Sequence, residues 1–265
     1  MPIDLVQEHD GVAEVVIDHP PVNALDVETW FTLADALTAA GRVPTNRVVI
    51  LRATGRGFCA GVDIKEVNAK GDEALVGVNR GCAAAFAAVY DCEVPVIAAV
   101  QGFCLGGGIG LVGNADIIVA SQDATFGLPE VDRGALGAAT HLARLVPQHT
   151  MRKMVYTAKP VTADELASYG SVAAVVPPDR LLAATLELAE EIAAKSPTII
   201  RRAKESLTAS TRSTSSAAIA SSRGSPMSSM SGAWRTSSAP PSSRSATPTP
   251  PGEASVTPVW TAGLG

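Results

Sequence analysis

The stretch that most constrains the fold lies at the centre of the chain, over residues 94–121. It contains two apolar runs, 96–101 and 117–120, which we predict to be strands. Near-continuous apolar strands are typical of a parallel sheet that is covered on both faces. Between them, three consecutive glycines (Gly106 to Gly108) open a short predicted helix that ends near Gly113. Bare backbone amides at such a position can bind a phosphate or stabilise an oxyanion.

Two other interpretations of this stretch compete with an oxyanion site. It is long enough to span a membrane, but Pro95 and the polar residues at 114–116 favour a soluble core. The spacing Gly108-x-Gly110-x-x-Gly113 also matches a dinucleotide fingerprint after a strand. A dinucleotide-dependent oxidoreductase therefore remains an alternative from the residues alone.

The rest of the chain alternates strand and helix signals. Two apolar-polar segments around Asp10-Gly11 predict a hairpin, and Asp26 predicts the start of a helix that runs to about residue 40. An apolar run at 48–52, an alanine-rich segment at 73–90 and an amphipathic segment at 180–195 continue the pattern. This order predicts an α/β core with parallel strand pairing.

Composition limits the classes of partner. The four cysteines have no CxxC spacing, so we expect reduced core thiols, and a cytoplasmic protein because no charged and apolar leader opens the chain. The four histidines have no i,i+4 partner, so we predict no metal site. The net charge of −5 argues against a nucleic-acid partner, and we expect no membrane partner.

The character of the chain changes near Leu207. Residues 208–265 are rich in Ser, Thr, Pro and Ala and show neither helical nor strand periodicity. Such a segment buries too little apolar surface to offset its ordering entropy, so we predict a low-complexity, disordered tail after a folded domain over 1–207. The tail is either a natural interaction segment or the product of a shifted reading frame.

Three sequence blocks in a fixed order favour the oxyanion site over the dinucleotide site. They are GFCAGVDIKE at 57–66, GFCLGGGI at 102–109 and FGLPE at 126–130. Together they resemble the enoyl-CoA hydratase/isomerase (crotonase) family, from about residue 3 to 207. The resemblance implies a ClpP-like spiral of repeated ββα units with a C-terminal helical region. It also implies an acyl-CoA thioester substrate, no separate bound cofactor, and a homotrimer or hexamer if the C-terminus is intact.

The resemblance assigns roles to residues of these blocks. The backbone amides of Val62 and Gly107 would stabilise the enolate oxygen of the thioester, and Glu130 would act as acid or base. The family's coenzyme A contacts map to the segment around the first glycine loop and to the triple glycine, at Ala60, Asp63, Ile64, Lys65 and Gly106.

One departure from the family pattern bears on the reaction. Family hydratases use two glutamates, and Gly110 stands where the first is expected. One carboxylate can move a proton but cannot readily both hold and split a water, so simple hydration is disfavoured. Further candidates for the substrate pocket are Asn79, Arg80, Asp132 and His141.

Within the family, the blocks at 21–24, 79–82, 108–114 and 126–144 look most like hydrolases of actinobacterial steroid ring catabolism. This implies hydrolytic C–C opening of a ring in a bicyclic diketo carboxyl-CoA. Two alternatives stay open: an enoyl-CoA isomerase or hydratase, and a non-catalytic CoA-binding paralogue.

Overall fold

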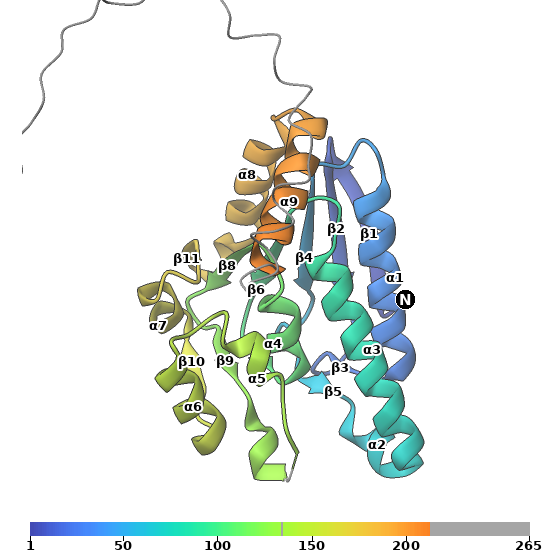
Figure 1. Ribbon diagram of the computed structural model, residues 1–265, viewed down its shortest axis with the longest axis vertical. Helices are drawn as coiled ribbons and strands as arrows, with labels where there is room; N and C mark the ends of the chain where they lie inside the picture. The colour runs from blue at the N-terminus through green and yellow to red at the C-terminus, as the bar shows by residue number, and fades with distance from the viewer. Residues whose placement is uncertain (134, 213–265) are drawn as a thin grey trace, which may run out of the picture. The chain divides into compact units, whose positions relative to one another are not determined.

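The computed structural model describes residues 1–133 and 135–212 (Figure 1). Its strands are β1 (Ile3–His9), β2 (Val12–Ile17), β3 (Ala24–Leu25), β4 (Val48–Ala53), β5 (Gly61–Val62), β6 (Val96–Val100), β7 (Phe103–Leu105), β8 (Ile117–Ser121), β9 (Thr125–Gly127), β10 (Val161–Thr162) and β11 (Ala174–Val176). Its helices are α1 (Val27–Arg42), α2 (Ile64–Lys70), α3 (Asp72–Tyr90), α4 (Gly107–Val112), α5 (Ala139–Leu142), α6 (Gln148–Thr157), α7 (Ala163–Ser168), α8 (Leu181–Ala193) and α9 (Pro197–Arg212), with 3-10 turns at Pro129–Arg133 and Pro178–Arg180.

The largest sheet has the order β1-β2-β4-β6-β8-β11. β1 and β2 form an antiparallel hairpin, and every later pair of neighbours is parallel. The hairpin turns at Asp10 and Gly11, as predicted, and Gly11 takes the positive φ of +74° that side chains rarely adopt. The predicted α/β core with parallel pairing is therefore confirmed.

The sheet is covered on both faces. In β4, Val49 and Leu51 face one apolar cluster, while Val48 and Ile50 face the other, because successive side chains of a strand point to opposite faces. Helices α1 and α3 complete the first cluster and α8 completes the second. Figure 1 shows α1 and α3 on one side of the sheet and α8 on the other. This double covering explains why these strands are apolar throughout.

The chain repeats one unit. A long strand of the main sheet is followed by a short strand and then by a helix, as in β2-β3-α1, β4-β5-α2, β6-β7-α4 and β8-β9-α5. The short strands leave the main sheet and pair with each other, β3 with β5 and β7 with β9. The predicted spiral of ββα units is confirmed, and its short strands bring loops from successive turns together.

Local capping fixes several helix starts. The Asp26 carboxylate accepts a hydrogen bond from the Thr29 amide at 2.8 Å and caps α1, which continues to Arg42, two residues beyond the prediction. Asp63 caps α2 in the same way.

The sequence predicts no strand at 103–105, because a three-residue strand is too short to show a period of two. The segment becomes strand β7 because it pairs with β9 in the folded protein.

Helix α9 is anchored to the body of the protein by two basic side chains. Arg201 donates hydrogen bonds to the carbonyl oxygens of Gly41 and Val43, at 2.9 and 2.7 Å. Lys204 is only 4% exposed and forms an ion pair with Asp116 at 2.7 Å. The helix ends at Arg212, five residues past the domain boundary that was predicted at 207. The rest of the predicted tail, 213–265, lies outside the described residues.

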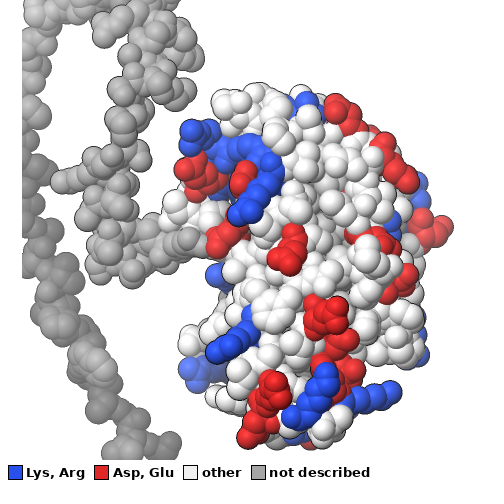
Figure 2. Space-filling model, turned by 90° about the vertical axis from the view of Figure 1, so that its right-hand side faces the viewer, with Lys and Arg blue, Asp and Glu red and all other residues white. Residues whose placement is uncertain are grey.

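The surface carries charges of both signs. On the face drawn in Figure 2, acidic and basic side chains are intermixed and separated by uncharged areas. In the described part of the chain, no helix is both long enough and apolar enough to cross a membrane.

Candidate active site

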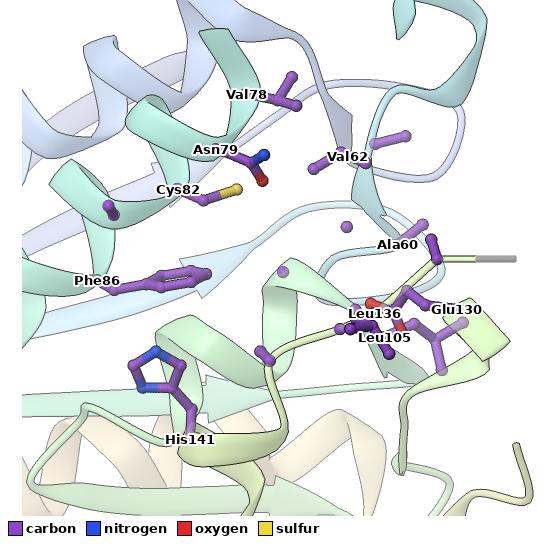
Figure 3. A pocket seen from close by; sticks show the side chains of 18 of the residues that line it. Ala60, Val62, Val78, Asn79, Cys82, Phe86, Leu105, Glu130, Leu136 and His141 are labelled. Carbon is purple, nitrogen blue, oxygen red and sulfur yellow. The ribbon is translucent and has the colours of Figure 1, made fainter. Parts of the chain in front are cut away.

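A cavity of about 1150 Å³ opens beside the short strands (Figure 3). Its walls come from Ala24 of β3 and from four further segments: residues 60–68, helix α3 with Asp91 after it, residues 105–107 with Asn114, and residues 129–144. Pockets that bind cofactors and drug-sized ligands commonly have volumes of about 300–1000 Å³. This cavity is therefore large enough for the acyl part of a thioester and the adjoining part of coenzyme A.

The two predicted amide donors lie in loops that are paired with each other. The Leu105 amide donates to the carbonyl oxygen of Cys59 at 2.8 Å, and the Cys59 amide donates to Phe103 at 3.2 Å. A Cβ atom built on Gly61 would lie 3.1 Å from the amide nitrogen of Gly107, so the backbones approach too closely for a side chain there. Gly61 also has a φ of +90°.

The amide directions suit a shared acceptor. The Asp63 amide donates to Leu25 of β3 at 2.9 Å. Successive amides of a strand point to opposite edges, so the amide of Val62 points away from β3. Gly107 is the first residue of α4, where helix amides have no partner within the helix. Both residues line the cavity.

Glu130 reaches the same cavity from the 3-10 turn after β9. Its carboxylate lies between two glycines: a Cβ atom on Gly106 would be 2.8 Å from Oε1, and one on Gly137 would be 2.5–2.6 Å from the carboxylate carbon and both oxygens. A side chain at either position would displace the carboxylate. Glycine at both positions therefore provides the space that Glu130 occupies.

The environment of Glu130 favours its neutral form. Burial raises its pKa above the ordinary value, and a backbone hydrogen bond only partly opposes this. Among the described residues, Oε2 is buried and has no hydrogen-bond partner. An unpaired buried carboxylate oxygen costs stability, and such groups are concentrated at functional sites.

The residues predicted to contact coenzyme A lie together at the cavity. Ala60, Asp63, Ile64, Lys65 and Gly106 all line it. The Asp63 carboxylate accepts a hydrogen bond from the Lys65 amide at 2.8 Å, because it caps α2. The Lys65 side chain remains exposed at the rim.

Helix α3 presents one stripe to the cavity. Asn79, Cys82, Phe86 and Tyr90 line it, at spacings of three and four residues that place them on one helix face. Arg80 follows Asn79 by one residue, which turns its side chain by about 100°. It is exposed and does not line the cavity, unlike the predicted Asn79.

Two further predicted pocket residues do not line the cavity. Gly110 is buried under the ring of Phe86: a Cβ atom on Gly110 would lie 2.0 Å from the ring's Cζ. An aromatic ring thus covers the place where the resemblance expects the first glutamate. Asp132 is exposed on the outer side of the 3-10 turn that carries Glu130.

His141 lines the cavity and is held from behind by a chain of polar groups. Its Nδ1 lies 2.9 Å from the side-chain nitrogen of Asn114, which also donates to the Gly110 carbonyl at 2.6 Å. The Asn114 side-chain oxygen accepts from Arg144 at 2.7 Å. The imidazole packs edge-on to Phe86, with ring centroids 4.9 Å apart. Burial, with help from the Arg144 charge, lowers the pKa of His141.

Comparison with known proteins assigns the chain to a family. The family model described as enoyl-CoA hydratase/isomerase matches residues 7–231. The chain belongs to the enoyl-CoA hydratase/isomerase family. An enoyl-CoA hydratase structure from Mycobacterium smegmatis has a TM-score of 0.78 at 26% identity, over 84% of this chain and 88% of that one.

Two curated relatives in the family are much more similar in sequence. A protein of Rhodococcus jostii (strain RHA1) is 64% identical over 208 residues, which are 78% of this chain and 81% of that protein. One of Mycobacterium tuberculosis is 62% identical over 208 residues, 78% and 84% of the two chains. Both are named (7aS)-7a-methyl-1,5-dioxo-2,3,5,6,7,7a-hexahydro-1H-indene-carboxyl-CoA hydrolase.

Sequence reasoning missed several residues that shape the site. Phe86, Asn114 and Arg144 line the cavity, and Gly137 makes space for Glu130. The spacing of Asn79, Cys82 and Phe86 was a signal for the helix face, but nothing local linked Asn114 to His141. Among the described residues, no group of three His, Cys, Asp or Glu side chains could hold a metal ion.

Proposed function

We propose that this protein opens a ring of a bicyclic diketo carboxyl-CoA by hydrolysis of a C–C bond, in steroid degradation. The observation that carries the proposal is that Val62, Gly107 and Glu130, from three separate segments, line a single cavity. The similarity to two hydrolases named for such a substrate supports it. The covering of Gly110 by Phe86 disfavours a two-glutamate hydratase mechanism.

In the proposed reaction the amides of Val62 and Gly107 bind the thioester oxygen. Water adds to the carbon of a ring ketone, and the bond from that carbon to the neighbouring ring carbon breaks. The electron pair moves through the conjugated system to the thioester oxygen, where an enolate forms. Two amides aimed at this oxygen stabilise the charge, and losing one such donor typically costs about 3–4 kcal/mol.

Glu130 moves the protons of this reaction. Its ionised form accepts a proton from the attacking water, and its neutral form returns a proton to the carbon that leaves as the enolate. The products together contain the substrate and one water: a carboxylic acid at one end of the broken bond and a C–H bond at the other. A raised pKa suits this role, because one group must act as base and then as acid near neutral pH.

The test is turnover of a bicyclic diketo carboxyl-CoA by the purified protein, followed by mass spectrometry for the addition of one water. We expect Glu130→Gln to reduce kcat at least 100-fold. Glu191→Gln, an exposed carboxylate on α8, is the matched control and should retain full activity. Rapid hydration of crotonyl-CoA with no action on the diketo substrate would contradict the proposal.

We further propose a homotrimer or hexamer, and a cytoplasmic location. The assembly rests on the family resemblance, and the location on four free thiols, most of them buried. Light scattering after size exclusion tests the assembly. The comparison is between this chain and a version whose residues after 212 come from the Rhodococcus relative. Trimeric or hexameric mass and equal activity in both versions would show that the tail is compatible with assembly, and a monomer in both would contradict the proposed assembly.

A further inference from the structure

The acyl end of the cavity contains a hydrogen-bond donor whose direction is fixed by its neighbours. Arg144 can only donate, so the Asn114 atom that faces it must be the oxygen. The Gly110 carbonyl can only accept, so the other Asn114 atom must be the nitrogen. The Asn114 amide is therefore oriented by two partners, and it presents an N–H to His141.

This orientation determines the tautomer of His141. Because Nδ1 faces a donor at 2.9 Å, it must accept, and it carries no proton. In the neutral ring the proton is then on Nε2. The lowered pKa keeps the ring neutral near pH 7, and its physical causes are burial and the nearby Arg144 charge.

His141 lines the cavity, and its Nε2 is not the nitrogen that meets Asn114. Figure 3 shows the imidazole below Phe86 with its upper edge turned toward that ring, whose centroid lies 4.9 Å away. The cavity lining includes apolar residues of α3, among them Ala83, Phe86 and Ala87, beside the polar residues that hold His141. A fixed donor in such surroundings selects a ligand that has an acceptor at that point.

The donor is also separate from the amide pair. Gly137 contacts the Glu130 carboxylate, and the segment that follows it forms the cavity wall as far as His141. In Figure 3, Glu130 and His141 lie on different sides of the cavity, with Glu130 beside Leu105 and His141 beyond Phe86. The cavity thus has polar groups at two places. One holds the amides of Val62 and Gly107 with Glu130, and the other holds His141.

We propose that His141 Nε2–H binds the oxygen of a second carbonyl on the acyl group, and thereby selects oxo-acyl thioesters. This inference rests on the proposed function and names a part of its substrate. As water adds to this ketone, the carbonyl oxygen gains the negative charge, and the fixed N–H stabilises it. In this proposal Asn114 and Arg144 are positioning residues, because Asn114 orients the ring and Arg144 orients Asn114.

The experiment compares two ligands and three variants. The ligands are the bicyclic diketo carboxyl-CoA and the same thioester without its ring ketone away from the CoA end. We expect wild type to bind the diketo compound at least 10-fold more tightly, and His141→Phe to lose this preference and about 100-fold in kcat/KM. His141→Gln keeps an N–H at a similar place and should restore most of the preference. His149→Phe, the same change at an exposed site on α6, should match wild type.

The tautomer gives an independent measurement. In protein with ¹⁵N-labelled histidine, the His141 signals, assigned by their loss in His141→Gln, should show a protonated Nε2 and an unprotonated Nδ1 at pH 7. A protonated Nδ1, or equal binding of the two ligands by wild type, would overturn the inference. If wild type binds with the expected preference but adds no water, the proposed function fails while the second-carbonyl site stands.

Discussion

Adding one methyl group at Gly110 tests whether Phe86 occupies the place of the missing glutamate. In Gly110→Ala the new Cβ would lie 2.0 Å from Cζ of Phe86 and 2.4 Å from the two neighbouring ring carbons. Ordinary carbon contacts are about 3.5–4.0 Å, so the ring tip must move by roughly 1.5 Å. We expect it to move toward the cavity that it lines, since its aromatic neighbours are Trp30, at 5.9 Å between centroids, and His141, at 4.9 Å.

The expected cost follows from two opposing terms. Forcing an extra carbon into a packed site typically costs about 1–3 kcal/mol. Replacing a helical glycine by alanine returns up to about 1 kcal/mol. The net loss should be about 1 kcal/mol, which lowers Tm by roughly 2–4 °C for a domain of this size. Activity should fall more steeply than stability, since the displaced ring enters the space of the acyl group and presses on His141.

A double-mutant cycle with Phe86→Ala isolates this contact. The four proteins (wild type, both single variants and the double variant) are unfolded in urea under identical conditions. In the Phe86→Ala background the methyl at Gly110 has space, so the two changes should couple favourably by about 1–3 kcal/mol. Additivity within about 0.5 kcal/mol would refute the assignment of this ring to the place beside Gly110.

Three further outcomes are expected. Because its neutral form is favoured in the fold, Glu130 lowers stability as pH rises through its raised pKa. Glu130→Gln should therefore melt above wild type at pH 7, and the difference should disappear in calorimetry below about pH 4.5. Gly137→Ala should reduce kcat at least 10-fold, because the new Cβ displaces the Glu130 carboxylate. Gly170→Ala is the control: its φ is positive but nothing lies within 4 Å of the added Cβ, so it should only lower Tm slightly. Lys204→Met removes the cation from the partly exposed Asp116, whose carboxylate keeps the Val96 amide as a donor. The change should cost about 2–3 kcal/mol in urea unfolding, with part of the loss recovered when Asp116→Asn is added.

Much of the framework was predictable because its signals are local. Capping by Asp26, the hairpin at Asp10-Gly11 and the apolar central strands depend on neighbouring residues or on a short period. The three ordered sequence blocks predicted the spiral of ββα units and the family, through the resemblance that they carry. They also indicated Val62, Gly107 and Glu130, whose proposed roles remain predictions that the structure accommodates in one cavity.

What the sequence determined by itself was thus the order of the main-sheet strands and of the long helices, the two glycine loops and the presence of a single glutamate at the third block. Only the tertiary structure decided what surrounds them. Phe86 covers Gly110, which lies 24 positions further along the chain. Arg144 orients His141 through Asn114, which is 30 positions from Arg144 and 27 from His141. Such contacts leave no periodic or local trace, because they form only when packing brings together side chains from separate turns of the spiral.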